Sequence, residues 1–177
     1  MGALAKSRLI VISGPSGAGK STVVRELMRE CSLPLWLSVS ATTRNPRRGE
    51  EDGKDYFFLT PEQFAERQES GDFLECKQYA GNWYGTLQSQ VTAGLAEGKW
   101  VILEIDVEGT LAVIEKHPEA LTIFVHSGSV EELERRLRAR NTESEEALAR
   151  RLATARRELA QKDRYRYEVI NRDVQQA

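Results

Sequence analysis

Gly14-Pro15-Ser16-Gly17-Ala18-Gly19-Lys20-Ser21 is the stretch that decides the fold of this 177-residue chain. It fits the phosphate-binding pattern G-x-x-x-x-G-K-[ST]. An apolar run of strand length, residues 8–13, precedes it, and apolar residues at 23, 24, 27 and 28 follow it at the spacing of one helix face. A strand, a glycine-rich turn and a helix start therefore stand in the order that a phosphate-binding loop requires.

The residue types in this loop indicate its chemistry. Its glycines let backbone N–H groups curl around phosphate oxygens, and the helix N-terminus adds partial positive charge. Lys20 is expected to reach the transferring phosphates, and the Ser21 hydroxyl is expected to bind Mg²⁺.

A second informative stretch covers residues 38–56. It offers Arg44 and Arg47, held three positions apart around Pro46, and then Glu50 and Tyr56. Planar guanidinium groups suit a dianionic phosphate, and a tyrosine hydroxyl adds a neutral donor. Taken alone, the same stretch could be a solvated surface loop, because its acidic residues offset its basic ones.

Composition agrees with one globular domain. The chain is 40% apolar with a net charge of −2, which argues against a general nucleic-acid binder. No apolar run approaches the roughly 20 residues that span a bilayer, so no membrane partner is expected. Cys31 and Cys76 lack metal-ligand spacing, which favours reduced thiols and a cytoplasmic location. His117 and His126 are expected to have capping or surface roles.

The pattern along the chain alternates strands and helices, with one insertion. A helix start is predicted at Thr60-Pro61-Glu62-Gln63, a helix over residues 87–97, and a buried strand over 100–106 that ends in an acidic residue. Further expected elements are a strand at 121–125, helices that start near 129 and 142, and a last strand at 167–171. Residues 35–86 read as a small inserted lobe.

Several motifs together resemble the guanylate kinases over nearly the whole chain. They are Gly14–Thr22, 38–56, Phe73-Leu74-Glu75, Gly81-Asn82-Trp83-Tyr84-Gly85-Thr86, Leu103-Glu104-Ile105-Asp106-Val107-Glu108-Gly109 and Arg135-Arg136-Leu137. The resemblance implies an α/β fold: a P-loop kinase core whose central parallel sheet is flanked by helices, a small mixed α+β GMP-binding lobe and a helical lid. The implied divisions are a core of 1–34 and 87–177, a lobe of about 35–86 and a lid of about 136–152.

The resemblance also implies the acceptor site. The positions that match the family's phosphate ligands are Arg44, Arg47, Tyr56 and Tyr84, and those that match its guanine ligands are Ser40, Glu75 and Thr86. Glu50, Glu104 and Asp106 are assigned to the same GMP site. A carboxylate suits guanine, which presents an N1–H and a 2-amino group side by side. Adenine has neither group and would leave Glu75 poorly satisfied.

For ATP, the resemblance implies the loop, arginines of the lid and an asparagine of the last core strand. The implied ATP ligands are Gly14, Pro15, Ser16, Gly17, Ala18, Gly19, Lys20, Ser21, Thr22, Arg136, Arg140 and Asn171. The residues expected to act in catalysis are Lys20, Arg44, Arg136 and Arg151, and Ser21 is the expected Mg²⁺ ligand, with Asp106 acting through water. Glu104, Glu108 and Asn141 stand where the family usually has aspartate, glutamine and glycine.

The resulting prediction is a kinase that converts ATP and GMP, or dGMP, to ADP and the nucleoside diphosphate. We expect in-line transfer with Mg²⁺ in a monomer or a homodimer. One alternative is a kinase of a sugar phosphate such as ribose 1,5-bisphosphate, which would not need the guanine ligands. The other is a non-catalytic interaction module, which the intact phosphate-binding loop disfavours.

Overall fold

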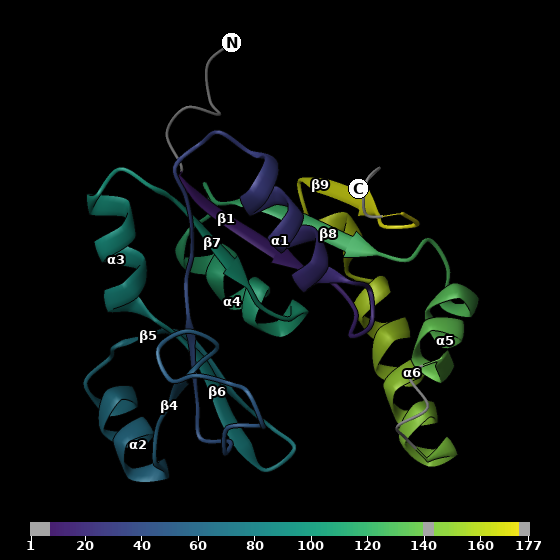
Figure 1. Ribbon diagram of the computed structural model, residues 1–177, viewed down its shortest axis with the longest axis horizontal. Helices are drawn as coiled ribbons and strands as arrows, with labels where there is room; N and C mark the ends of the chain where they lie inside the picture. Colours follow the sequence, from purple (N-terminus) through teal and green to yellow (C-terminus); the bar gives the residue numbers. More distant parts are fainter. Residues whose placement is uncertain (1–7, 140–143, 174–177) are drawn as a thin grey trace.

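A parallel sheet forms the centre of the molecule (Figure 1). The computed structural model describes residues 8–139 and 144–173. All neighbouring strands of the sheet run parallel, in the order β2-β7-β1-β8-β9. These strands are β1 (Leu9–Ser13), β2 (Leu35–Leu37), β7 (Trp100–Glu104), β8 (Leu121–His126) and β9 (Tyr167–Ile170).

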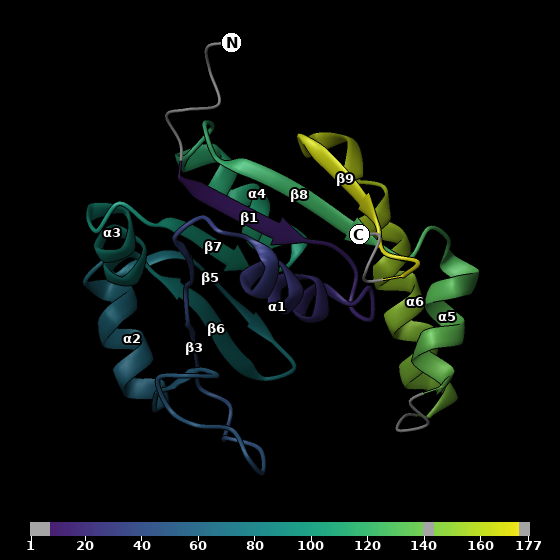
Figure 2. The same ribbon diagram turned by 45° about the horizontal axis from the view of Figure 1, so that its top comes forward.

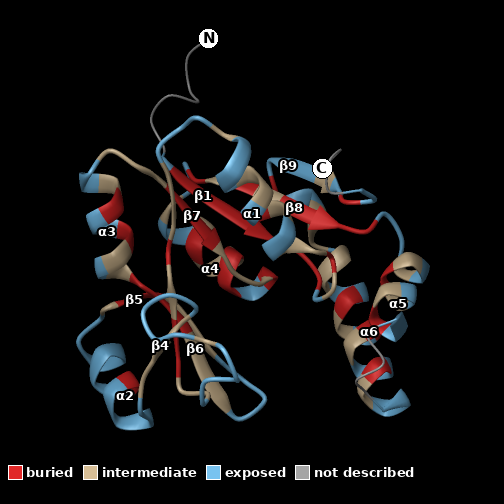
Figure 3. Cartoon of the chain, viewed as in Figure 1, coloured by how far each residue is buried: buried red, intermediate tan, exposed pale blue. Residues whose placement is uncertain are grey.

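Strand β1 is buried over its whole length because helices cover both faces of the sheet (Figure 3). Alternate residues point to opposite faces. Leu9 and Val11 pack in one cluster with apolar residues of α3 (Gln88–Ala96) and α4 (Val107–Lys116). Ile10 and Ile12 pack in another with apolar residues of α1 (Lys20–Glu30). The near-continuous apolar run of β1 follows from this double burial.

A second, mixed sheet is inserted between β2 and α3. Its order is β4-β3-β6-β5, and its strands are β3 (Ser40–Thr42), β4 (Phe57–Phe58), β5 (Phe73–Tyr79) and β6 (Asn82–Leu87). Helix α2 (Pro61–Glu69) packs Phe64 against Phe73 and Trp83. The predicted inserted lobe is therefore present.

The start of α2 confirms a local prediction. Thr60 Oγ1 accepts a hydrogen bond from the Gln63 N–H at 3.2 Å, and the Gln63 side chain accepts one from the Thr60 N–H at 2.9 Å. This reciprocal pair is a capping box, which satisfies two N–H groups that the first turn would otherwise leave unpaired.

The inserted lobe is one arm of the molecule, and two helices form a second arm. They are α5 (Val130–Ala139) and α6 (Glu145–Leu159), followed by the short 3-10 helix η1 (Lys162–Arg164). A cluster that includes Leu133, Leu137, Leu148 and Leu152 holds them together. The second of these helices is predicted to start near Thr142, a residue that lies outside the described ones. In the structure Ser144 caps α6, so the helix begins at Glu145.

The two arms flank the core in both views (Figures 1 and 2). The lobe of β3–β6 lies on the α3 side, and α5 with α6 lies on the β8–β9 side. Strand β1 ends in the loop that precedes α1, between the arms. Within the described ranges, 8–139 and 144–173, no helix has the length and apolar character to cross a membrane.

Candidate active site

The loop after β1 has the backbone shape that phosphate binding needs. Gly14, Gly17 and Gly19 have φ values of 139°, 92° and 86°, which side chains other than glycine rarely adopt. The Lys20 ammonium turns back over the loop and donates to the carbonyls of Gly14 at 2.7 Å and Pro15 at 3.1 Å. Burial lowers the pKa of Lys20. The Lys20 ammonium therefore lies against the loop that is expected to bind phosphate.

Acidic side chains at the end of β7 face this loop. The Ser21 hydroxyl donates to Glu104 Oε1 at 2.6 Å, so the predicted metal ligand already contacts the carboxylate that ends the strand. Asp106 caps α4 and accepts the Gly109 N–H at 2.9 Å. Glu104 and Asp106 both act to raise the pKa of Lys20 against the effect of burial. Hydroxyl and carboxylate oxygens are the ligand types that Mg²⁺ prefers.

Glu158, at the C-terminal end of α6, is a further acidic group in this cluster. It too acts electrostatically on Lys20. Burial raises the pKa of Glu158. The sequence does not single it out, because its spacing is that of an ordinary helical acid.

In the lobe, three predicted guanine ligands lie side by side. Ser40 on β3 pairs with Thr86 on β6, and Thr86 pairs with Glu75 on β5. The Thr86 hydroxyl donates to Glu75 Oε1 at 2.7 Å. Burial raises the pKa of Glu75, whereas the Thr86 hydrogen bond acts in the opposite direction. The row places a hydroxyl, a hydroxyl and a carboxylate on the same face of one small sheet.

The predicted phosphate ligands gather at the other end of the lobe. Arg44 makes a bidentate pair with Glu50, with both N···O distances at 2.9 Å. Glu50 also accepts the Arg47 N–H at 2.6 Å, and the hydrogen bonds from Arg44 and Arg47 lower its pKa. The Arg44 guanidinium lies 5.4 Å from the Tyr56 ring centroid, and the Tyr56 and Tyr84 rings are 6.2 Å apart. Burial raises the pKa of Tyr56, so its hydroxyl stays a neutral donor near pH 7.

Lys77 on β5 is a functional candidate that sequence reasoning missed. Its ammonium pairs with Asp106 and lies 3.3 Å from Glu108 Oε2. Burial has the largest single effect and acts to lower the pKa of Lys77, but the hydrogen bonds and negative charges of Asp106 and Glu108 together outweigh it, so the pKa is raised. No local pattern signals this residue, because its partners lie on a helix of the core.

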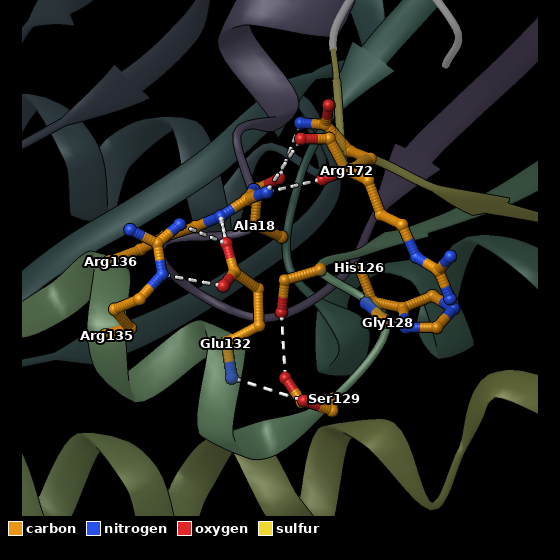
Figure 4. A network of polar contacts seen from close by, with 10 residues as sticks. Ala18, His126, Gly128, Ser129, Glu132, Arg135, Arg136 and Arg172 are labelled. Carbon is orange, nitrogen blue, oxygen red and sulfur yellow. Dashed lines mark hydrogen bonds and ion pairs between the residues drawn. The ribbon is translucent and has the colours of Figure 1, made fainter.

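The arm of α5 and α6 brings two arginines to the phosphate loop, and Figure 4 shows one of them, Arg136, near Ala18. Arg151 donates to Ser16 Oγ at 2.7 Å. Arg136 donates to Glu132 at 2.7 Å and to the Asn171 carbonyl at 2.7 Å. Asn171 in turn donates from its side chain to the Ala18 carbonyl at 2.8 Å. The third predicted lid arginine, Arg140, lies outside the described residues, as does Asn141.

Glu132 organises the base of this arm. It accepts hydrogen bonds from both Arg135 and Arg136, and these lower the pKa of Glu132 to about 2 (Figure 4). It therefore stays ionised at neutral pH and holds the Arg136 side chain in one orientation.

The prediction for His126 is wrong. Its ring is buried, and Nδ1 accepts the Gly128 N–H at 3.1 Å. Since a backbone N–H can only donate, the ring proton is on Nε2, which lies 2.7 Å from Glu168 Oε1 and donates to it. The pair joins β8 to β9, strands whose residues are far apart in the sequence. This distance along the chain is why sequence spacing did not reveal it.

A phosphate loop at the carboxyl end of a central parallel strand, with basic side chains from two arms, defines a P-loop phosphotransferase. The family profile "Guanylate kinase" matches residues 6–177. The chain belongs to the guanylate kinase family and is a nucleoside monophosphate kinase, as its sequence predicts.

Individual relatives support this assignment. The guanylate kinase of Rhodopirellula baltica is 61% identical over 173 residues, which cover 96% of this chain and 83% of that protein. The guanylate kinase of Fusobacterium nucleatum is 50% identical, with coverages of 96% and 90%. The crystal structure of guanylate kinase from Anaplasma phagocytophilum has a TM-score of 0.75 at 30% identity, with coverages of 94% and 78%.

Proposed function

We propose that this site transfers the γ-phosphoryl group of ATP to GMP and produces ADP and GDP. The observation that carries the proposal is the row of Ser40, Thr86 and Glu75, which offers a half-buried carboxylate in the lobe, next to the first turn of α4. Guanine has the two adjacent donors, N1–H and the 2-amino group, that such a carboxylate can accept. The dGMP base is identical, and so we extend the proposal to dGMP.

On the donor side, the loop of residues 14–22 cradles the ATP phosphates. Lys20 leaves the two loop carbonyls and binds transferring oxygens instead. Arg151 already contacts the loop through Ser16, and Arg136 is held by Glu132 beside it. We assign these two arginines, with Arg140, to the stabilisation of charge on the transferring group. Asn171 positions the loop through Ala18 on the nucleoside side of ATP.

On the acceptor side, Arg44 and Arg47 bind the GMP phosphate, with hydroxyl donors from Tyr56 and Tyr84. Glu50 holds the Arg44 guanidinium in a fixed plane before the substrate arrives. This arrangement lowers the entropy cost of the bidentate contact. The cations also reduce the repulsion between two anionic substrates.

The residues present fit Mg²⁺. Ser21 Oγ and Glu104 Oε1 lie 2.6 Å apart and supply hard oxygen ligands, and Asp106 lies on the same edge of the sheet. We propose that Ser21 binds the ion directly and that Asp106 acts through water. When bound, Mg²⁺ neutralises charge on the phosphate oxygens.

Transfer needs no covalent enzyme intermediate. A GMP phosphate oxygen attacks the γ-phosphorus in line while the bond to the β,γ-bridging oxygen breaks, and the leaving group departs as ADP. The acceptor phosphate is mostly deprotonated near pH 7, so no general base is required. The chain's contribution is positioning and charge stabilisation, and closure of the two arms would exclude the water that hydrolyses ATP.

A coupled ADP-release assay with ATP and Mg²⁺ tests the proposal. The acceptors compared are GMP, dGMP, AMP and ribose 1,5-bisphosphate. Strong turnover with GMP and almost none with AMP supports the guanine row, whereas turnover with only the sugar phosphate refutes it. The division into core, lobe and lid by residue number, the cytoplasmic location and a monomer or homodimer stay predictions.

A further inference from the structure

Lys77 occupies a place in the acceptor lobe that the proposed mechanism leaves unexplained. It follows Glu75 by two residues on β5, so both side chains are on the same face of the sheet. Across the strands, Lys77 pairs with Tyr84, two residue pairs along from the pair of Glu75 and Thr86 and therefore on the same face. Lys77 therefore projects from the face that carries the proposed guanine row.

The partners of Lys77 lie on the core, at the N-terminus of α4. One Asp106 carboxylate oxygen, Oδ1, accepts the Gly109 N–H at 2.9 Å, and the other, Oδ2, pairs with the Lys77 ammonium. The core thus fixes one oxygen of Asp106, and the lobe fixes the other. Both side chains are half-buried, with exposures of 27% for Lys77 and 32% for Asp106.

Glu108 is the weaker partner. Its Oε2 lies 3.3 Å from the Lys77 ammonium, but its side chain is 82% exposed. An exposed pair of this kind contributes little because water screens it. The half-buried contact with Asp106 is the one that sets the geometry.

Local charge gives Lys77 a second effect. Glu75, Glu104 and Asp106 bring negative charge to the region where a dianionic acceptor must bind. Arg44 is already paired with Glu50, and Lys20 belongs to the donor loop. Lys77 is thus a lobe cation that offsets the carboxylates on the nucleoside side of the acceptor.

We propose that Lys77 is a positioning residue of the acceptor site, which orients the Asp106 carboxylate and offsets its charge so that GMP can bind. The inference rests on the proposed function and on the place of Asp106 in the GMP site, which the family resemblance implies in addition to its proposed contact with Mg²⁺ through water. It places the contribution of Lys77 in acceptor affinity, not in the phosphoryl transfer step, because the ammonium acts through Asp106.

Steady-state kinetics of four proteins test the inference: the wild type, Lys77→Met, Asp106→Asn and the double variant. Lys77→Met is expected to raise KM for GMP about tenfold, which corresponds to about 1.4 kcal/mol. The kcat value and KM for ATP should stay within about threefold of wild type. In the Asp106→Asn background, the Lys77→Met effect should fall below about threefold, because its partner is already lost.

The control is Lys54→Met, which removes a lysine of the same lobe that is 71% exposed and lies 3.3 Å from Glu51. It should leave all three constants unchanged. Lys77→Gln is measured in parallel, because it keeps a polar side chain if the methionine variant does not fold, as judged by circular-dichroism melting.

Three results are informative in different ways. An unchanged KM for GMP in both Lys77 variants overturns the inference. If Lys77→Met raises KM for GMP by the same factor with and without the Asp106 carboxylate, the inference is also overturned, because Lys77 then acts independently of Asp106. If Asp106→Asn itself leaves KM for GMP unchanged, the assignment of Asp106 to the acceptor site fails, and this failure is distinct from the other two.

Discussion

Replacement of Glu75 by glutamine is the sharpest test of the acceptor assignment. The two side chains have nearly the same shape, and the Thr86 hydroxyl, now 2.7 Å from Glu75 Oε1, can donate to the glutamine oxygen as well. The fold should therefore survive. The second carboxylate oxygen is what changes, because an amide NH₂ donor replaces this acceptor.

The size of the effect on kcat/KM follows from the number of hydrogen bonds to guanine that are lost. Glu75 can accept from both N1–H and the 2-amino group of guanine, and hydrogen bonds to charged groups each contribute roughly 1.5–3 kcal/mol. Glutamine keeps at most one of these bonds and turns the other into a contact between two donors. A loss of about 3–4 kcal/mol lowers kcat/KM for GMP by a factor on the order of 10²–10³. AMP has no N1 proton, so its kcat/KM should stay level or rise.

The assay measures ADP release with either GMP or AMP as the acceptor, at fixed concentrations of ATP and Mg²⁺. The ratio of the two kcat/KM values should fall at least about a hundredfold in Glu75→Gln. Glu69→Gln is the matched control, since it neutralises an exposed carboxylate of the same lobe. A ratio within threefold of wild type would show that Glu75 does not contact the base.

Three further outcomes are expected. Lys20→Ala should lower kcat by at least about 10² while the melting temperature stays near wild type, since the hydrogen bonds of its ammonium are to loop carbonyls at 2.7 and 3.1 Å; near-normal turnover would contradict the assignment of Lys20 to the phosphate-binding loop. Gly109→Ala should raise KM for GMP about tenfold without loss of stability, because helix propensity favours alanine by about 1 kcal/mol but the new Cβ would lie 2.8 Å from Glu75 Oε2. Burial raises the pKa of Glu75, so kcat/KM for GMP should fall on acidification through a pH above the usual glutamate value, and Glu75→Gln should lack this component. If kcat/KM for GMP falls at the same pH in wild type and in Glu75→Gln, the assignment of this pH dependence to Glu75 is refuted.

The local elements could be predicted from the sequence because each depends on neighbours along the chain. The capping box of α2 joins residues three apart, and the phosphate loop needs glycines at positions of positive φ within one short turn. The buried strand predicted over 100–106 is present as β7, whose apolar middle residues are buried. The family resemblance supplied the candidate ligands of the lobe, and the rows of β3, β6 and β5 bring three of them together.

Other features could not be predicted because their partners come from separate elements. Glu158 approaches Lys20 only through the packing of α6, and Lys77 meets Asp106 only because the lobe lies against α4. His126 was misjudged for the same reason, since its partner Glu168 lies on a neighbouring strand 42 residues away. Such pairs leave no periodic or spaced signal in the sequence.

What the sequence by itself determined is the phosphate loop and the helix that follows it, because backbone dihedrals, glycine positions and helix periodicity act over a few residues. What only the tertiary structure decided is which distant side chains reach that loop. Ser21 meets Glu104 across 83 positions, Arg151 meets Ser16 across 135, and Asn171 meets Ala18 across 153. These contacts depend on the order of parallel strands and on the two arms, because each crossover places a strand end, and the residues after it, on the same edge of the sheet.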